Sequence, residues 1–416
     1  MNEKITLLDI LKILIFTQFF VFFIIPAQAQ AQWRYDRTGI YANEKELLKT
    51  WPAKGPAMRW FYDGIGIGYS SVSVASEKIY VTGVTEGNGY LFVFDLNGKL
   101  LNKFMYGDEW MVNYEGARAT PIIDDGKIFL MSGAGNLICI DEQNLNLIWK
   151  RNIFEDFESE NIRWGFNETP LIIGDMLIIT PGGKEHNVVS LNKNTGELIW
   201  SSTGMGDLSA YCSPLYIGDQ ETQLIVTITA GNIIGLEAST GNMLWSFESK
   251  NTNSIHANTP IYHNGWLLCT SVDKGCTMLQ LSDGGRKAEI VWTLPEWDNM
   301  MGALVKIGDY VYGSGSGYKE RVWYCVDWAT GEVKYKEKGL AMGVTIVADD
   351  RLYCYTDKGE MALVKATPEK FEVVSQFMIE KGTEQHWAHP VIYKGVLYVR
   401  HGDTLMAYNV KNVSSN

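Results

Sequence analysis

Side chains that could bind and orient a ligand recur at one kind of position in this sequence, directly ahead of short apolar runs. Aromatic rings there offer stacking surfaces, while guanidinium, amide, carboxylate and imidazole groups can orient a small molecule or a peptide. Tyr69 and Glu115 stand at positions of this kind. The candidate ligand-binding set that we single out is Arg118, Trp164, Asn167, Glu168, Tyr211, His256, His386, Trp387 and His389.

These residue types do not define a catalytic centre. Glu168 or His256 could act as a general acid or base, but no motif supplies a partner, so we assign no catalytic residue. His386 and His389 are spaced like a metal-binding pair, but on a loop that leads into a strand this spacing has no fixed geometry, and we predict no metal site. The sequence has no phosphate-binding loop, no Gly-x-Ser-x-Gly elbow and no His-Glu-x-x-His motif.

An internal repeat predicts the elements that must position these side chains. Residues 190–200, 235–245 and 325–335 align without gaps, and residues 139–149 are a weaker fourth copy. Each copy reads as a strand, a turn and a strand. The Asx-x-x-Thr-Gly core supplies the turn, because the Asx side chain accepts hydrogen bonds from nearby backbone N–H groups and glycine tolerates a positive φ.

A second marker opens an apolar run in each unit: it is a small or hydroxyl residue, or in one unit a histidine, and proline follows it in five of the eight units. The eight markers are Ser73, Thr120, Thr169, Ser213, Thr259, Ala303, Thr345 and His389, and their separations lie between 42 and 49 residues. Eight four-stranded units of about 45 residues are typical of a β-propeller. We therefore predict an all-β fold, an eight-bladed β-propeller with four-stranded antiparallel blades.

The two ends of the chain are predicted to complete one blade together. The last repeat has too few residues after Asn409 for its outer strand, whereas Trp60 lies in an unmatched outer-strand pattern near the start. We expect residues 56–62 to complete blade eight, which closes the ring and removes the free sheet edges. The propeller then spans residues 56–412, and residues 30–55 form an N-terminal strap outside it.

Residues 1–29 have the pattern of a signal peptide. Lys4 and Lys12 precede an apolar stretch of about 13 residues, followed by small residues suited to cleavage after Ala29 or Ala31. That stretch is short for a membrane span of about 20 residues, although an uncleaved anchor is the alternative. No lipid-attachment cysteine follows it. We predict a periplasmic or secreted protein with no membrane span after signal removal.

The charge of the chain narrows the classes of partner, and the placement of its cysteines argues against disulfides. The chain has 48 acidic and 36 basic residues, a net charge of −12, which disfavours binding to nucleic acid or anionic lipid. Cys139 and Cys325 occupy equivalent places in different repeats, which the architecture holds apart, so we expect buried free thiols. A Cys269–Cys276 bridge is the one pairing left open. We expect a monomer.

The recurring Ala/Gly-x-Asp-x-x-Thr-Gly-x-x-x-Trp pattern resembles the tryptophan-docking repeat of quinoprotein propellers, the pyrroloquinoline-quinone-like repeat family. The resemblance covers residues 33–412 and is strongest in blades two to six. It implies that one aromatic residue per blade packs between neighbouring blades. By position, these docking residues are Trp60, Trp149, Trp200, Trp245, Trp292 and Tyr335.

Members of this family divide into dehydrogenases that use pyrroloquinoline quinone with calcium and cofactor-free scaffolds, such as the propeller of the outer-membrane protein assembly machinery. This chain departs from the dehydrogenases because it lacks a vicinal Cys-Cys pair, long inserts and a haem module. It departs from the assembly scaffold because it lacks the lipoprotein cysteine. We therefore expect an exported, soluble, non-catalytic scaffold that needs no cofactor and binds a protein, peptide or glycan on its channel face.

The alternative is a pyrroloquinoline-quinone-dependent dehydrogenase of an alcohol or sugar with a degenerate site. The resemblance would then make Trp164 or Trp387 the floor on which the quinone stacks. Arg118 would contact a carboxylate of the quinone, and Glu168 with Asn167 would hold calcium. A third possibility is a non-quinone enzyme, such as a hydrolase or lyase, on the same scaffold. The candidate residues could also only line a wide, polar channel mouth and bind nothing.

Overall fold

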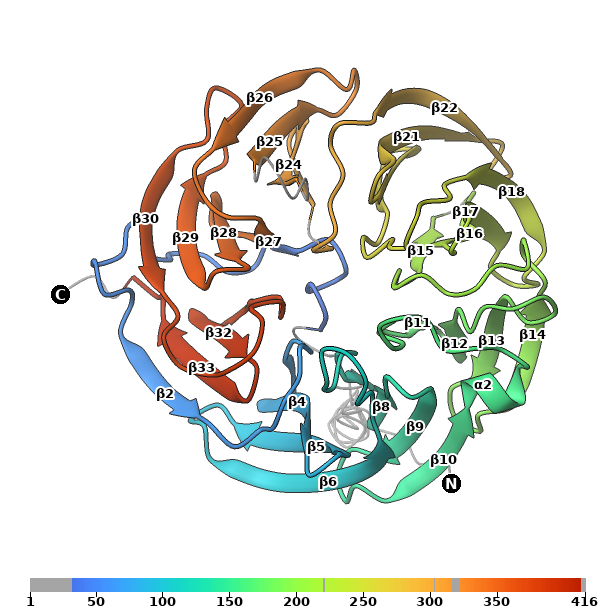
Figure 1. Ribbon diagram of the computed structural model, residues 1–416, viewed down its shortest axis with the longest axis horizontal. Coiled ribbons are helices and arrows are strands. Elements are labelled where there is room, and N and C mark those ends of the chain that lie inside the picture. Colours follow the sequence, from blue (N-terminus) through green and yellow to red (C-terminus); the bar gives the residue numbers. More distant parts are fainter. Residues whose placement is uncertain (1–31, 220, 303, 316–321, 413–416) are drawn as a thin grey trace, which may run out of the picture.

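The computed structural model describes residues 32–219, 221–302, 304–315 and 322–412. Eight antiparallel sheets are arranged around a central axis (Figure 1), which confirms the eight-bladed propeller. The predicted signal peptide, residues 1–29, lies outside the described residues. Within the described ranges, no helix is long and apolar enough to cross a membrane.

The first four blades follow the chain from the inner to the outer strand. Their strands are β3 (Ser73–Ala75), β4 (Lys78–Thr85), β5 (Asn88–Asp95) and β6 (Leu100–Asp108); β7 (Ile122–Asp124), β8 (Lys127–Met131), β9 (Asn136–Asp141) and β10 (Leu147–Asn152); β11 (Leu171–Ile173), β12 (Met176–Ile179), β13 (Val188–Asn192) and β14 (Leu198–Ser202); β15 (Leu215–Gly218), β16 (Gln223–Ile228), β17 (Asn232–Glu237) and β18 (Met243–Glu248). A short helix, α2 (Ile153–Asp156), follows β10.

The remaining blades repeat this order until the last. Their strands are β19 (Ile261–His263), β20 (Trp266–Ser271), β21 (Gly275–Ser282) and β22 (Lys287–Leu294); β23 (Val305–Ile307), β24 (Tyr310–Ser314), β25 (Val322–Asp327) and β26 (Val333–Lys338); β27 (Gly343–Ala348), β28 (Arg351–Thr356), β29 (Glu360–Lys365) and β30 (Val373–Met378); β31 (Val391–Tyr393), β32 (Val396–His401) and β33 (Thr404–Asn409), with β2 (Met58–Tyr62) as the outer strand.

The strand that closes the ring, β2, lies within the residues 56–62 predicted from the sequence. β2 pairs antiparallel with β33, with Trp60 opposite Ala407, and the Asn409 N–H donates to the Ala57 carbonyl at 2.8 Å. The Trp60 indole then donates to the Leu96 carbonyl of blade one at 3.1 Å. One strand from the start of the chain therefore joins the last blade to the first.

The contacts of the docking tryptophans explain why the repeat combines a Thr-Gly turn with a tryptophan at its end. The Trp149 indole N–H donates to the Lys193 carbonyl in the next blade at 2.9 Å. A Cβ on Gly196, which has φ +75°, would lie 2.9 Å from that indole ring. Glycine is therefore required at this position for two reasons, the left-handed turn and the close approach of the indole ring. Trp200, Trp245 and Trp292 make the same kind of hydrogen bond to the next blade.

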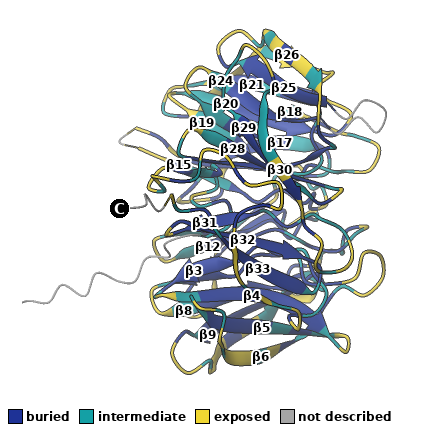
Figure 2. Ribbon diagram, turned by 90° about the vertical axis from the view of Figure 1, so that its left-hand side faces the viewer, coloured by how far each residue is buried: buried dark blue, intermediate teal, exposed yellow. Residues whose placement is uncertain are grey.

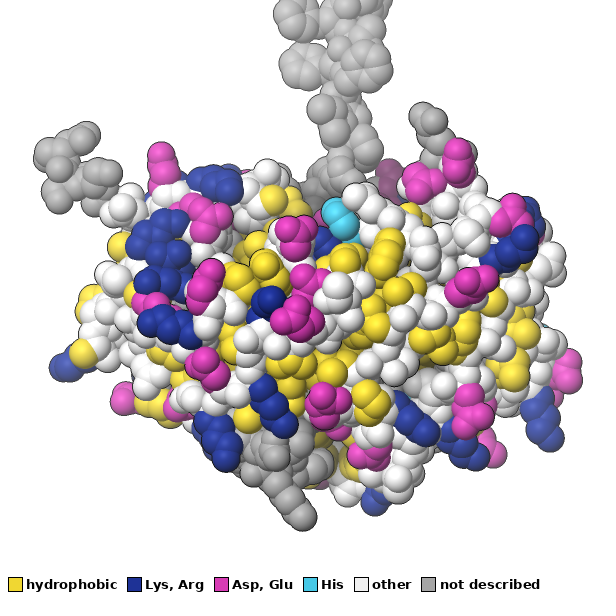
Figure 3. All heavy atoms as spheres, turned by 90° about the horizontal axis from the view of Figure 1, so that it is seen from above, with side chains coloured by type: hydrophobic (Ala, Val, Ile, Leu, Met, Phe, Trp, Pro, Cys, Tyr) yellow, Lys and Arg dark blue, Asp and Glu magenta, His cyan; other side chains and the backbone are white. Residues whose placement is uncertain are grey.

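The six cysteines are all buried and free, so the predicted thiols are confirmed and the Cys269–Cys276 bridge is absent. Burial is greatest along the inner and middle strands, and the turns at both faces are exposed (Figure 2). The rim also exposes hydrophobic side chains of the outer strands, such as Leu147 of β10 and Ile290 of β22. Figure 3 shows such hydrophobic side chains among charged ones on one part of the rim.

The predicted strap, residues 30–55, does not lie wholly outside the ring. β1 (Ile40–Tyr41) adds to β27 as a parallel strand, and the residues before it enter the central channel. Arg34 is only 3% exposed, and Gln32 donates to the Ile123 carbonyl of inner strand β7 at 3.2 Å. We refer to residues 32–38 as the channel segment.

Candidate functional site

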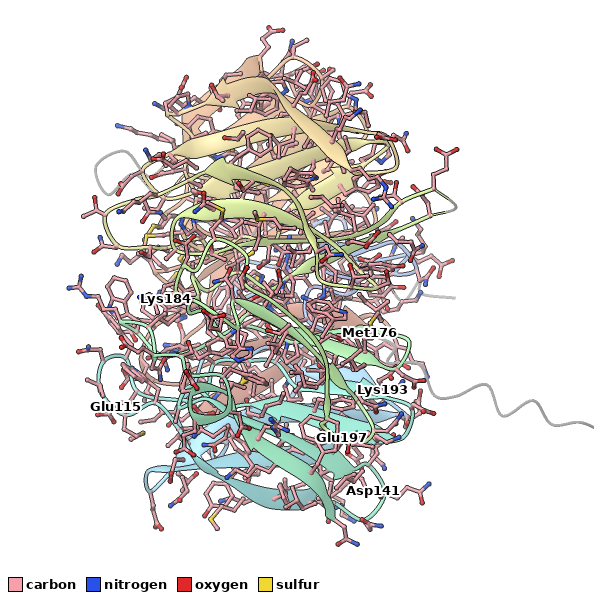
Figure 4. All side chains as sticks on the ribbon, turned by 90° about the vertical axis from the view of Figure 1, so that its right-hand side faces the viewer. Glu115, Asp141, Met176, Lys184, Lys193 and Glu197 are labelled. Atoms are coloured by element: carbon pink, nitrogen blue, oxygen red, sulfur yellow. The ribbon has the colours of Figure 1, made fainter. Side chains whose placement is uncertain are left out.

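The loops that lead into the inner strands form one face of the ring, which we call the mouth face. Figure 4 shows Glu115 and Lys184 on this face, whereas Met176 and Lys193 lie on the opposite face. All nine residues of the predicted set belong to these loops or to the first inner-strand positions that follow them. The repeat therefore predicted correctly that they share one face, but their side chains do not converge on one site.

Trp387 lies at the centre of an aromatic cluster on the mouth face. Its ring centroid is 5.0 Å from that of Tyr69 and 5.0 Å from that of Tyr114, with tilted geometry in both pairs. The Tyr69 hydroxyl donates to Gln385 at 2.9 Å. Tilted aromatic pairs at this separation attract each other beyond their burial. We call Tyr69, Tyr114 and Trp387 the aromatic cluster.

Arg118 is a clamp between two mouth-face loops. Its Nε donates to the Trp164 carbonyl at 2.9 Å and its Nη1 to the Gly116 carbonyl at 2.5 Å, while Nη2 reaches the carbonyls of Asn113 and Tyr114. Four of its five N–H groups are thus directed at backbone carbonyls. This geometry does not fit the role of a carboxylate-binding residue that the quinone hypothesis gave to Arg118.

Trp164 and Tyr211 form a second aromatic pair, with centroids 6.1 Å apart. The Trp164 backbone N–H donates to the Tyr211 hydroxyl at 3.2 Å, and the Arg163 guanidinium lies 4.7 Å from the Trp164 ring centroid. Since Arg118 holds the Trp164 backbone, this pair is connected to the aromatic cluster. A cation already covers this indole, so Trp164 is not an open floor for a planar ligand.

Glu168 is buried and points into its own blade. Both carboxylate oxygens lie 3.1 Å from the Thr180 backbone N–H. Burial raises the pKa of Glu168 to about 8, against the opposing effects of the Thr180 hydrogen bonds and the Arg37 charge. The neighbouring Asn167 has an unpartnered buried Oδ1 atom. A Glu168 carboxylate that is bound by the Thr180 N–H inside its own blade does not fit the role of a calcium ligand.

The three predicted histidines have internal partners and lie apart. His256 contacts the Ser271 hydroxyl at 2.8 Å, and burial lowers its pKa to about 4. His386 contacts the Tyr355 hydroxyl at 2.6 Å and stacks on His401 with centroids 3.6 Å apart. Among the described residues, no group of three or more His, Cys, Asp or Glu side chains is placed to hold a metal.

His389 faces the central channel and contacts the channel segment. Because a guanidinium can only donate, His389 Nδ1 accepts from Arg34 at 3.3 Å and Nε2–H donates to the Met301 carbonyl at 3.2 Å. Arg34 also donates to the carbonyls of Leu304 at 2.7 Å and Thr345 at 3.3 Å. Burial, with the Arg34 charge, lowers the pKa of His389 to about 3.

Arg37 binds the opposite wall of the channel in the same way. It donates to the carbonyls of Pro170, Thr169 and Pro214 at 2.5, 3.2 and 3.1 Å, and its guanidinium lies 6.0 Å from the Trp33 ring centroid. Burial lowers the pKa of Arg37 to about 10, so it stays charged at neutral pH. The channel segment therefore occupies part of the channel through cation-to-carbonyl hydrogen bonds.

Sequence reasoning missed Tyr114, Arg34 and Arg37 as features of this face and channel. Two features of the sequence could have indicated these residues. The loop that holds Tyr114 also contains Trp110, Met111 and Val112, an apolar run where a turn would be polar. The two arginines stand three residues apart in an acidic chain, directly after the predicted signal region.

Glu168 gives a testable pH dependence. A carboxyl whose folded-state pKa is raised favours folding most at low pH, and stability falls as pH rises from the unfolded value of 4.5 to the folded value of about 8. Glu168→Gln removes this loss and keeps an acceptor for Thr180. The variant should match the parent near pH 4.5 and exceed its stability by roughly 2–4 kcal/mol near pH 8. Urea unfolding across this range measures the difference, and an exposed Glu160→Gln control should show none.

Comparisons with known proteins agree with this fold. A family model described as outer membrane protein assembly factor BamB matches residues 87–337, which is more than half of the 416 residues. BamB from Moraxella catarrhalis is 13% identical with a TM-score of 0.62, and the match covers 85% of this chain and 99% of that chain. No curated protein matches the chain.

Two solved dehydrogenases are similar in structure. The quinohemoprotein alcohol dehydrogenase from Comamonas testosteroni has a TM-score of 0.66 at 12% identity, covering 93% of this chain and 81% of that chain. A europium-containing methanol dehydrogenase has a TM-score of 0.63 at 13% identity, covering 89% and 90%. At these identities the likeness shows the shared propeller fold alone, and the function has to be argued from the residues of the site.

Proposed function

This chain belongs to the family of PQQ-like repeat propellers whose model is described as outer membrane protein assembly factor BamB, and on that basis we propose that it is an exported, non-catalytic binding module of the cell envelope. Its mouth face holds a protein or peptide partner. The observation that carries the proposal is that the chemically capable side chains of this face are bound internally, while apolar and aromatic side chains between them are exposed.

The exposed groups come from two loops of the mouth face, with the loop between β10 and β11 lying between them. Val112 is 68% exposed and Tyr114 is 46% exposed, and Met111 is exposed beside them. Met205 and Leu208 are exposed in the loop after β14. Exposed apolar groups rimmed by polar side chains are typical of protein interaction sites. Arg118, which fixes the first of these loops by its backbone, would keep this surface in one conformation for binding.

The dehydrogenase alternative is less well supported because its assigned roles do not match the geometry. Arg118 is directed at backbone carbonyls, Glu168 faces the Thr180 N–H inside the blade, and the Trp164 ring carries a guanidinium. Trp387 lies between two tyrosines rather than on an open surface. No pair of these residues is arranged to hold a quinone and its calcium together.

A photo-crosslinking side chain at Val112 tests the proposal. In cells, the Val112 variant should give one discrete crosslinked product with an envelope protein, whereas the same side chain at Leu147, exposed on the rim strand β10, should not. The product should disappear when the crosslinker at Val112 is combined with Trp387→Leu. Equal crosslinking from both positions would contradict a mouth-face site. A rise in the melting temperature with pyrroloquinoline quinone and calcium would favour the dehydrogenase instead.

A further inference from the structure

The aromatic cluster presents an open ring face where the backbone is strained. Tyr114 adopts φ +50°, a left-handed conformation that is uncommon for residues with bulky side chains, yet the residue remains 46% exposed. Trp387 packs against it from one side. Since the hydrophobic effect would favour covering this ring, its exposure at a strained position indicates a surface that is kept for a ligand.

Two exposed carboxylates lie in the loops that carry the aromatic cluster, and two guanidiniums, those of Arg118 and Arg400, lie near Tyr69. Glu115 follows Tyr114 directly, and Glu384 precedes Gln385; both side chains are exposed, and neither carboxylate forms an ion pair within the part of the chain that the structure describes. Burial raises the pKa of Tyr69 to about 12, and the nearby Glu384 adds to the rise against the Arg118 charge. Both guanidiniums already donate to backbone carbonyls.

The mouth face already shows how it accommodates cations. The Arg163 guanidinium lies 4.7 Å from the centroid of Trp164, and Arg118 lies 5.6 Å from that of Tyr69. Positive groups over ring faces gain from the quadrupole of the ring, by about 0.5–2 kcal/mol depending on exposure. Tyr114 offers the same kind of ring surface, and the exposed Glu115 follows it in the same loop. An acidic or phosphorylated partner would be repelled at this place.

We propose that the aromatic cluster binds a lysine or arginine side chain of an extended basic peptide segment, with the cation over Tyr114 and between the carboxylates of Glu115 and Glu384. This inference rests on the proposed binding function of the mouth face and specifies the chemistry of its partner. The −12 net charge of the chain would accelerate the encounter with such a segment. The cluster would then select a cation at a defined position.

Peptide titration tests the inference. The probes are two acetylated and amidated hexapeptides, one alternating glycine with arginine and one alternating glycine with citrulline, the uncharged counterpart of arginine. Tryptophan fluorescence or calorimetry reports binding to the intact protein. The arginine peptide should bind at low salt and weaken as salt rises, and the citrulline peptide should bind at least tenfold more weakly. Equal binding of the two peptides would overturn the inference.

Matched variants distinguish binding at a defined site from attraction by the net charge of the protein. Tyr114→Leu, which keeps an apolar side chain, and Glu384→Gln should each weaken the arginine peptide at least fivefold. Glu289→Gln removes the same charge from the exposed outer strand β22 and should have no effect. If Glu384→Gln and Glu289→Gln weaken binding equally, attraction by the net charge explains it and the inference fails. If neither peptide binds while Val112 still crosslinks its partner, the inference fails and the proposed function stands. If peptide binding and the Val112 crosslink are both absent, the inference and the proposed function both fail.

Discussion

Replacing Arg400 with methionine should lower the free energy of unfolding by about 3–5 kcal/mol. Arg400 is 2% exposed in β32, and its Nη1 donates at 2.6 Å to the hydroxyl of Ser70 and the carbonyl of Thr82. Its Nε donates to the Gly402 carbonyl at 2.9 Å and its Nη2 to the Gly66 carbonyl at 3.2 Å. Methionine fills a similar volume but removes all of these donors. Ser70 and Thr82 keep hydrogen bonds to each other, whereas the Gly402 and Gly66 carbonyls lose the Arg400 N–H groups, and each unsatisfied buried group costs about 1–3 kcal/mol.

The position of Arg400 makes the effect large. Ser70 and Thr82 belong to blade one and Arg400 to blade eight, so the guanidinium joins the blades at which the chain closes on itself. Burial lowers the pKa of Arg400 to about 9, which leaves it protonated at neutral pH. Urea unfolding followed by tryptophan fluorescence measures the change. Arg59→Met, on the exposed face of β2, is the control and should change stability little. A loss of less than 1 kcal/mol for Arg400→Met would contradict this account.

Arg400 also shows what the sequence could not predict. The repeat spacing predicted the blades, the docking tryptophans and the closing strand, because each depends on a local pattern that recurs. The partners of Arg34, Arg118 and Arg400 include backbone carbonyls that are distant in the sequence, those of Leu304, Trp164 and Thr82 respectively. Backbone carbonyls carry no sequence signal, since every residue has one. The sequence therefore placed Arg118 on the mouth face, but it could not show that the donors of these arginines are already bound.

The same reason limits prediction of the site. Trp387 and Arg118 were placed correctly on the mouth face, but the residue that completes the aromatic cluster, Tyr114, lies within a loop whose length differs from blade to blade. His256 and Glu168 share the repeat position of the others, yet their side chains turn into the blades toward Ser271 and Thr180. Position in a repeat fixes the backbone, whereas the rotamer depends on neighbours that the repeat does not specify.

A chain that begins at residue 63 should lose at least about 10 °C in melting temperature, or fail to accumulate, because blade eight then lacks its outer strand. Trp60 stacks with Phe94 of blade one, with centroids 6.4 Å apart, and Tyr62 meets the same ring at 5.0 Å. Truncation removes these contacts and the β2–β33 hydrogen bonds, and it leaves β33 as a free edge open to aggregation. It also removes the channel segment, so a second variant must separate the two losses.

A circular permutant supplies that separation. In blade three, five residues, 193–197, connect Asn192 to the outer strand that begins at Leu198, and Asn409 and Met58 occupy the corresponding places in blade eight. Copying residues 193–197 after Asn409, followed by 58–62, should therefore let the truncated chain close its ring in the same register. We expect the permutant to recover most of the lost melting temperature, and the remaining deficit to report the contribution of the strap and channel segment. If the permutant were no more stable than the truncated chain, ring closure by β2 could not be the source of the loss, and the buried arginines of the channel segment would have to account for it.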